Sequence, residues 1–177
     1  MAGSLPEAAT PVWRRGAEVF DFAARGATIT ERFAATAKAA AASIAIVQGA
    51  QAASYAELDR RSNRLARYLQ RCGVSAGDVV ALRAGRSIRS LTAMLATLKL
   101  GAAYAPLDPA APADYQAWQL QDCGARIVLV TGCGTRDLPV ATFDLDEALA
   151  ACEAEDDWAL ENVCRPEDIA YVMYTSG

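Results

Sequence analysis

The side chains of this chain that could do chemistry do not include a histidine. Ser-His-Asp and Cys-His catalysis, histidine metal sites and a histidine pH switch are therefore excluded for this sequence. The best remaining candidates are Thr175, Ser176 and Gly177, which directly follow the hydrophobic run 169–174. A glycine-containing loop with hydroxyl side chains, placed after a strand, can present amides and hydroxyls to phosphate oxygens. A complete phosphate loop also carries a lysine, so these three residues alone do not establish a phosphate site.

Other reactive side chains have simpler structural interpretations, and they give no predicted catalytic or metal-ligating residue. Neither lysine of the chain, Lys38 or Lys99, follows a glycine loop. The turn 132–134 (GCG) begins like a dinucleotide fingerprint, but Asp137 stands where the third glycine belongs. The five cysteines lack CxxC spacing, so we interpret them as small buried residues in a reducing compartment. We interpret four clustered carboxylates as a solvated surface run: Glu153, Glu155, Asp156 and Asp157.

Composition and charge narrow the class of protein further. The 177 residues suffice for one domain or for part of a larger one. With 17 basic and 21 acidic residues the net charge is −4, which argues against nucleic acid or a membrane surface as the partner. The uncharged stretch 39–56 is too polar to span a membrane, and the N-terminus has no apolar signal-peptide core. We therefore expect a cytoplasmic protein.

Hydrophobic periodicity predicts alternating helices and strands from Thr28 onward. Residues 1–27 mix proline, glycine and small residues without a period, and we interpret them as an N-terminal extension or linker. Helices are expected over 28–42, 55–72, 87–100, 112–123 and 146–151. Strands are expected over 43–48, 79–83, 102–107, 126–131, 140–143 and 169–174. This alternation predicts an α/β fold in which a largely parallel sheet carries helices on its faces.

The helix expected over 55–72 has the clearest local signal. Ser54 and Glu57 match a capping box, in which each side chain accepts a hydrogen bond from the backbone amide of the other residue. Apolar residues lie on one face of this helix and five arginines lie largely on the other: Arg60, Arg61, Arg64, Arg67 and Arg71. We interpret the arginine face as solvated, with acidic neighbours, because no aromatic platform for nucleic acid is interleaved with it.

Three stretches, read together, resemble the core motifs of a known family. Residues 54–58 (SYAEL) continue into 63–66 (NRLA), residues 98–109 read LKLGAAYAPLDP, and residues 169–177 read IAYVMYTSG. In this order and spacing they resemble the first three core motifs of amino-acid adenylation domains of nonribosomal peptide synthetases, members of the AMP-binding superfamily. The resemblance covers residues 28–177. The resemblance implies that these residues are the N-terminal part of the large α/β subdomain of an adenylate-forming enzyme. The rest of that adenylation domain would then be the partner of this chain.

The resemblance also implies a function. Such a domain uses ATP and Mg²⁺ to activate an amino acid as aminoacyl-AMP, and loads it onto a phosphopantetheinyl carrier protein. By this resemblance the first two motifs have a structural role in the fold. The third implies that Thr175, Ser176 and Gly177 begin the loop around the β- and γ-phosphates of ATP. The family's loop continues to a lysine, and its amino-acid pocket and magnesium-binding carboxylate lie further along the chain. We therefore expect these 177 residues by themselves to be inactive and to bind ATP and Mg²⁺ only weakly.

Two alternatives remain open. The chain could be a non-catalytic module, because adenylation domains often dock a small MbtH-like protein near the second motif, here between Ala102 and Pro112. It could instead belong to an acyl- or aryl-CoA ligase, although such ligases usually lack the Ala-Tyr-x-Pro-Leu-Asp-Pro form. In either case an unfinished sheet predicts that the isolated chain associates or is marginally stable.

Overall fold

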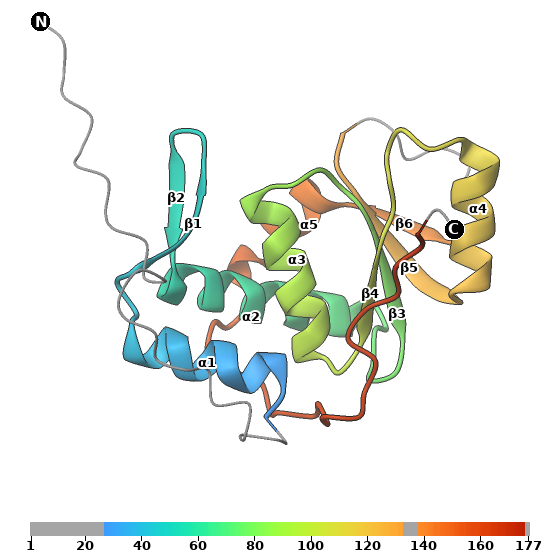
Figure 1. Ribbon diagram of the computed structural model, residues 1–177. Helices are drawn as coiled ribbons and strands as arrows, with labels where there is room; N and C mark the ends of the chain where they lie inside the picture. The colour runs from blue at the N-terminus through green and yellow to red at the C-terminus, as the bar shows by residue number, and fades with distance from the viewer. Residues whose placement is uncertain (1–26, 133–137, 176–177) are drawn as a thin grey trace, which may run out of the picture.

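A parallel four-stranded sheet forms the centre of the computed structural model, which describes residues 27–132 and 138–175 (Figure 1). In sheet order its strands are β4 (Ala103–Pro106), β3 (Val79–Arg83), β5 (Ala125–Val130) and β6 (Ala141–Asp144). The helices are α1 (Ile29–Ala39), α2 (Tyr55–Arg71), α3 (Ile88–Lys99), α4 (Ala113–Asp122) and α5 (Leu145–Ala151). None of the helices in these two ranges is long and apolar enough to cross a membrane. The predicted α/β class is confirmed, whereas the expected extension lies, except for Ala27, outside the described residues.

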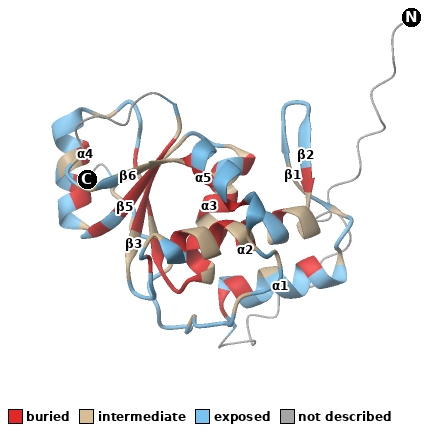
Figure 2. Cartoon of the chain, turned by 180° about the vertical axis from the view of Figure 1, so that it is seen from behind, coloured by how far each residue is buried: buried red, intermediate tan, exposed pale blue. Residues whose placement is uncertain are grey.

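Helices cover both faces of the sheet because the chain reverses its direction across the sheet at β4. From β3 it passes through α3 to β4 on one side, and from β4 it returns through α4 to β5 on the other. On the α4 face, Leu120 shares a core with Val128 and Val130. On the opposite face α2, α3 and α5 share the larger core, and Figure 2 shows buried residues along these helices and the strands. The continuous apolar run of β5 is therefore explained by cover on both faces.

The helices begin where the sequence places capping residues. Ser54 Oγ accepts a hydrogen bond from the Glu57 amide (3.3 Å), and the Glu57 carboxylate accepts one from the Ser54 amide (2.8 Å). The predicted capping box is therefore confirmed. Thr28 and Glu31 form a second box at the start of α1, and Ser87 caps α3. Local capping chemistry thus fixes the first turns of α1, α2 and α3, whereas α4 begins after Pro112 without a side-chain cap.

The arginine face of α2 is largely exposed and has acidic neighbours, as predicted, and these neighbours come from the acidic cluster, which is therefore more than a solvated run. Residues 155–158 lie against this face, and Arg64 Nη2 is 3.3 Å from Asp157 Oδ2. Arg67 donates to two backbone carbonyl oxygens of the segment, at 3.1 and 2.9 Å, and its guanidinium lies 5.4 Å from the centre of the Trp158 ring. Further ion pairs to the same segment come from Arg60 and Arg71. The acidic run therefore ties the chain after α5 to α2.

Two strand predictions also need correction. Residues 169–174 are not a strand, because only one parallel bridge joins this stretch to the sheet, between Tyr171 and Tyr104. Its apolar side chains lack the cover that a buried strand needs, since Ile169 is 68% exposed. The stretch 43–48 does form β1 (Ile44–Gln48), but it pairs antiparallel with an unforeseen β2 (Gln51–Ser54) instead of joining the parallel sheet. Figure 1 shows this hairpin projecting from the body.

Candidate functional site

The segment that carries the predicted phosphate-binding residues lies along the edge of β4. The Tyr104 amide donates to the Ala170 carbonyl oxygen (3.1 Å), and the Val172 amide donates to the Tyr104 carbonyl oxygen (3.0 Å). Because this bridge is parallel, the segment carries Thr175 toward the carboxyl ends of the strands, where open α/β sheets bind their ligands. Thr175 is exposed there. The other two predicted residues lie outside the described part of the chain: Ser176 and Gly177.

A second contact fixes the segment one residue before Thr175. The Tyr174 hydroxyl donates to Oδ2 of Asp122, the last residue of α4, at 2.8 Å, and lies 3.1 Å from the Gln119 carbonyl oxygen. The Tyr174 ring meets Trp118 edge-on, with centroids 5.5 Å apart. Desolvation, reinforced by the hydrogen bond to Asp122, raises the pKa of Tyr174 well above its ordinary value. The hydroxyl therefore remains a donor at neutral pH, and Thr175 starts from a fixed point on α4.

The other loops at this end of the sheet supply few groups for chemistry. After β4, the Asp108 carboxylate accepts a hydrogen bond from the Ala110 amide (2.9 Å) and is used to form a turn. After β5, Gly132 turns the chain at φ +80°, while Cys133 and Gly134 lie outside the described residues. Within residues 27–132 and 138–175 no three cysteine or carboxylate side chains gather as metal ligands.

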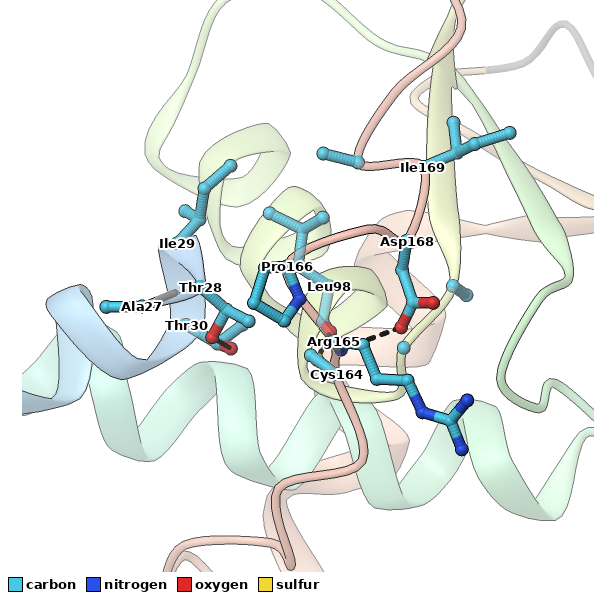
Figure 3. A pocket seen from close by; sticks show the side chains of 13 residues that line it. Ala27, Thr28, Ile29, Thr30, Leu98, Cys164, Arg165, Pro166, Asp168 and Ile169 are labelled. Atoms are coloured by element: carbon cyan, nitrogen blue, oxygen red, sulfur yellow. Dashed lines mark hydrogen bonds between the residues drawn. The ribbon is translucent and has the colours of Figure 1, made fainter. Parts of the chain in front are cut away.

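A cavity of about 170 Å³ lies away from Thr175, between the start of α1, the end of α3 and residues 164–170 (Figure 3). Its lining is largely apolar and includes Ile29, Leu98 and Ile169. At its rim the backbone amide of Arg165 donates to the Asp168 carboxylate (2.8 Å), as Figure 3 shows. A triphosphate needs a convergent set of donors, which this lining does not present, so we do not assign nucleotide binding to the cavity.

The first two framework motifs meet in a buried polar cluster. Lys99, from the second motif, donates to Asp59 Oδ1 and Asn63 Oδ1 on α2, both at 2.6 Å. Asn63 donates in turn to the Asp157 carbonyl oxygen (2.8 Å), and the Lys99 ammonium lies 5.6 Å from the centre of the Phe33 ring. Desolvation lowers the pKa of Lys99, an effect that Asp59 opposes. These contacts tie α1, α2 and α3 together, so Lys99 has a structural role away from the candidate phosphate site.

Comparisons with known proteins agree with this fold. The sequence pattern of the family described as AMP-binding enzyme matches residues 33–177. Surfactin synthase subunit 2 of Bacillus subtilis (strain 168) is 39% identical over 155 residues, which are 86% of this chain and 4% of the synthase. The crystal structure of the nonribosomal peptide synthetase FmoA3 (S1046A) has a TM-score of 0.78 and 32% identity, covering 85% of this chain and 16% of FmoA3. The N-terminal subdomain of Klebsiella oxytoca NpsA shares the fold, with a TM-score of 0.76 and 23% identity over 84% of this chain and 38% of NpsA.

The parallel sheet, its two helical layers and the segment along β4 define the class of this molecule as the α/β subdomain of adenylate-forming enzymes. This chain belongs to the AMP-binding enzyme family. The similar proteins reported above include nonribosomal peptide synthetases, so the predicted resemblance to their adenylation domains is confirmed. The chain spans only a small part of their length.

Proposed function

We propose that this chain serves in an adenylation domain that activates an amino acid for nonribosomal peptide synthesis in the cytoplasm. The amino-acid carboxylate attacks the α-phosphorus of ATP, aminoacyl-AMP forms and pyrophosphate leaves. The aminoacyl group then passes to the phosphopantetheine thiol of a carrier protein, and AMP is released. One observation carries this proposal: in an AMP-binding fold, the segment along β4 brings Thr175 to the ligand-binding end of the sheet.

In this proposal Thr175, Ser176 and Gly177 bind the β- and γ-phosphates of ATP. Small residues let backbone amides and hydroxyls approach phosphate oxygens closely, which positions the triphosphate and neutralises part of its charge. Mg²⁺ would bind with ATP and further shield the phosphates. Lys99 does not supply positive charge at the phosphates, because it is occupied by Asp59 and Asn63.

The experiment that tests this proposal is ATP–pyrophosphate exchange in a chimera. Residues 28–177 replace the matching residues of an adenylation domain of surfactin synthase subunit 2. We expect amino-acid-dependent exchange, and about a 10- to 100-fold lower kcat/KM for ATP in Thr175→Ala, since a charge-assisted hydrogen bond contributes about 1.5–3 kcal/mol. Thr36→Ala, on the exposed face of α1, is the matched control and should exchange normally.

Two results would contradict the proposal. Full exchange by the Thr175→Ala chimera would show that Thr175 has no role at the phosphates. Exchange catalysed by the 177-residue chain alone would show that it does not act as part of a larger domain.

A second candidate function, partner binding, is favoured by an exposed aromatic pair on α4. Tyr115 and Trp118 stack with centroids 5.6 Å apart and are 43% and 49% exposed. They adjoin the stretch where an MbtH-like protein was predicted to dock. Within that stretch Ala105 is fully buried, whereas residues 108–110 and 112 are exposed beside α4. We propose this surface as the docking site of an MbtH-like protein.

Pull-down with a purified MbtH-like protein tests the docking proposal. Trp118→Ala should lose binding, whereas Trp158→Ala, which removes an exposed tryptophan elsewhere, should keep it. Undiminished binding by Trp118→Ala would refute the proposed surface.

Acyl- or aryl-CoA ligation is the alternative activity, and it differs in the acceptor of the adenylate. The 39% identity to surfactin synthase subunit 2 supports the carrier-protein acceptor. Transfer of the activated acid to CoA instead of a carrier protein would favour the ligase.

A further inference from the structure

We propose that Tyr174 and Asp122 are positioning residues that set where the phosphate loop begins, an inference that rests on the proposed role of Thr175. The Tyr174 hydroxyl donates to the Asp122 carboxylate at 2.8 Å. Asp122 ends α4, and α4 packs on the sheet through Leu120, which is fully buried. The hydrogen bond therefore connects the residue before Thr175 to a rigid element.

This contact matters because the segment has few other attachments to the sheet. One bridge, at Tyr171, supplies its two backbone hydrogen bonds to β4. The ring of Tyr171 stacks on Tyr104 with centroids 5.7 Å apart, but Tyr171 is still 51% exposed, as are the neighbouring apolar side chains of Ile169 (68%) and Met173 (58%). A segment with so little burial opens locally unless other contacts hold it. Tyr174 supplies the contact closest to Thr175.

The chemistry of the pair suits positioning. A tyrosine hydroxyl donating to a carboxylate is a charge-assisted hydrogen bond, which is stronger than a neutral one. The edge-on contact with Trp118 holds the Tyr174 ring over α4 from a second direction. The Tyr174 hydroxyl has one proton and donates it to this carboxylate, so the hydroxyl is not available as an acid toward a substrate. Their effect on ATP is therefore indirect, through the location of the amides and hydroxyls that follow.

Amide hydrogen exchange of the 177-residue chain tests, without any ligand, whether the hydrogen bond between Tyr174 and Asp122 anchors the segment. Tyr174→Phe removes only the hydroxyl, and Asp122→Asn keeps the shape of an exposed side chain. We expect the Val172 and Tyr104 amides to exchange about tenfold faster in Tyr174→Phe and by a smaller factor in Asp122→Asn. The Leu107 amide, which bonds across β4 to β3, should exchange at its original rate. Tyr55→Phe, the same change at the start of α2, is the matched control, because the Tyr55 ring packs near Phe33 of α1.

A second measurement separates this inference from the proposed function. Sodium tripolyphosphate is titrated into each variant, and the amide shift of Thr175 is followed by NMR. We expect weak binding by the unaltered chain and about fivefold weaker binding by Tyr174→Phe, with binding by Tyr55→Phe unchanged. Unchanged exchange in Tyr174→Phe would overturn the anchor. Faster exchange together with equal tripolyphosphate affinity would overturn its role in positioning. Faster exchange with no tripolyphosphate binding by any variant would support the anchor and contradict the proposed function.

Discussion

Replacing Lys99 with methionine tests how the first two motifs hold the helical layer together. Lys99 has a side chain that is 9% exposed and bonds to Asp59 and Asn63 at 2.6 Å. Methionine keeps the apolar length of the lysine stem but leaves Asn63 Oδ1, in a residue that is 1% exposed, without its donor. A buried acceptor that loses its partner costs about 1–3 kcal/mol.

Two further effects fix the expected magnitude. Breaking a buried ion pair costs about 3–5 kcal/mol, but Asp59 is 28% exposed and water replaces much of that loss. The desolvation that lowers the pKa of Lys99 shows that burying this ammonium is itself unfavourable, and methionine removes that penalty. From these opposing terms we expect Lys99→Met to lower the free energy of unfolding by about 2 kcal/mol.

Urea unfolding followed by circular dichroism at pH 7 measures this difference. Lys38→Met is the matched control, because Lys38 is the other lysine of the chain and is exposed. It should change stability by less than about 0.5 kcal/mol. A Lys99→Met chain as stable as the unaltered one, or more stable, would refute the view that this cluster holds the framework.

We expect the stability of the chain to depend on pH through the same lysine. Its pKa is lower in the folded chain than the ordinary value of 10.5, so between these two values the unfolded chain binds more protons. Stability from this group should therefore rise as the pH increases through that window. Lys99→Met should lack this rise, which urea unfolding between pH 8 and pH 10.5 would detect. An equal rise in the free energy of unfolding of the unaltered chain and of Lys99→Met would show that other groups cause the rise.

Four more outcomes follow from particular residues. Ser54→Ala should lower the free energy of unfolding by about 1 kcal/mol, and an unchanged urea midpoint would show that α2 does not depend on this cap. The hydrogen bonds from Ser54 lower the pKa of Glu57. The stabilisation from the Glu57 carboxylate should therefore be present above pH 4.5 and lost as the pH falls through the lowered pKa. Glu57→Gln should not show this loss. Arg67→Ala should release residues 155–158 and red-shift the fluorescence of Trp158, and an unaltered spectrum would mean that this segment is held by other contacts. The exposed apolar side chains of residues 169–173 should make the isolated chain associate as concentration rises, whereas a monomer at all concentrations in sedimentation would contradict this.

Features that depend on neighbouring residues could be predicted from the sequence. The Ser54 capping box lies within four residues, and β5 is marked by its continuous apolar run. β3 was predicted with its observed bounds. A parallel strand that is covered on both faces has a continuous apolar run in place of alternating polar and apolar residues. The β1–β2 hairpin was missed, although Gly49, at φ +59° between two short strands, is a usable turn signal.

Features that depend on distant residues could not be predicted. The partners of Arg67 lie about 90 residues away along the chain, so the arginine face and the acidic run were interpreted separately. The contact between Tyr174 and Asp122 spans 52 residues and has no motif of its own. The run 169–174 has strand composition, but strand formation also requires a partner along its whole length and cover on its faces. In the candidate site, the position of Thr175 was therefore predictable from the motif, whereas its anchor was not.

Photo-crosslinking tests the central claim most directly. An ATP analogue with a photoreactive group on the γ-phosphate is irradiated with the surfactin synthase chimera, and the labelled peptides are identified by mass spectrometry. Our account predicts labelling of the peptide that contains residues 170–177, with excess ATP preventing it. Labelling confined to other peptides, such as those that line the cavity beside α1, would contradict the assignment of the triphosphate to Thr175 and the two residues that follow it.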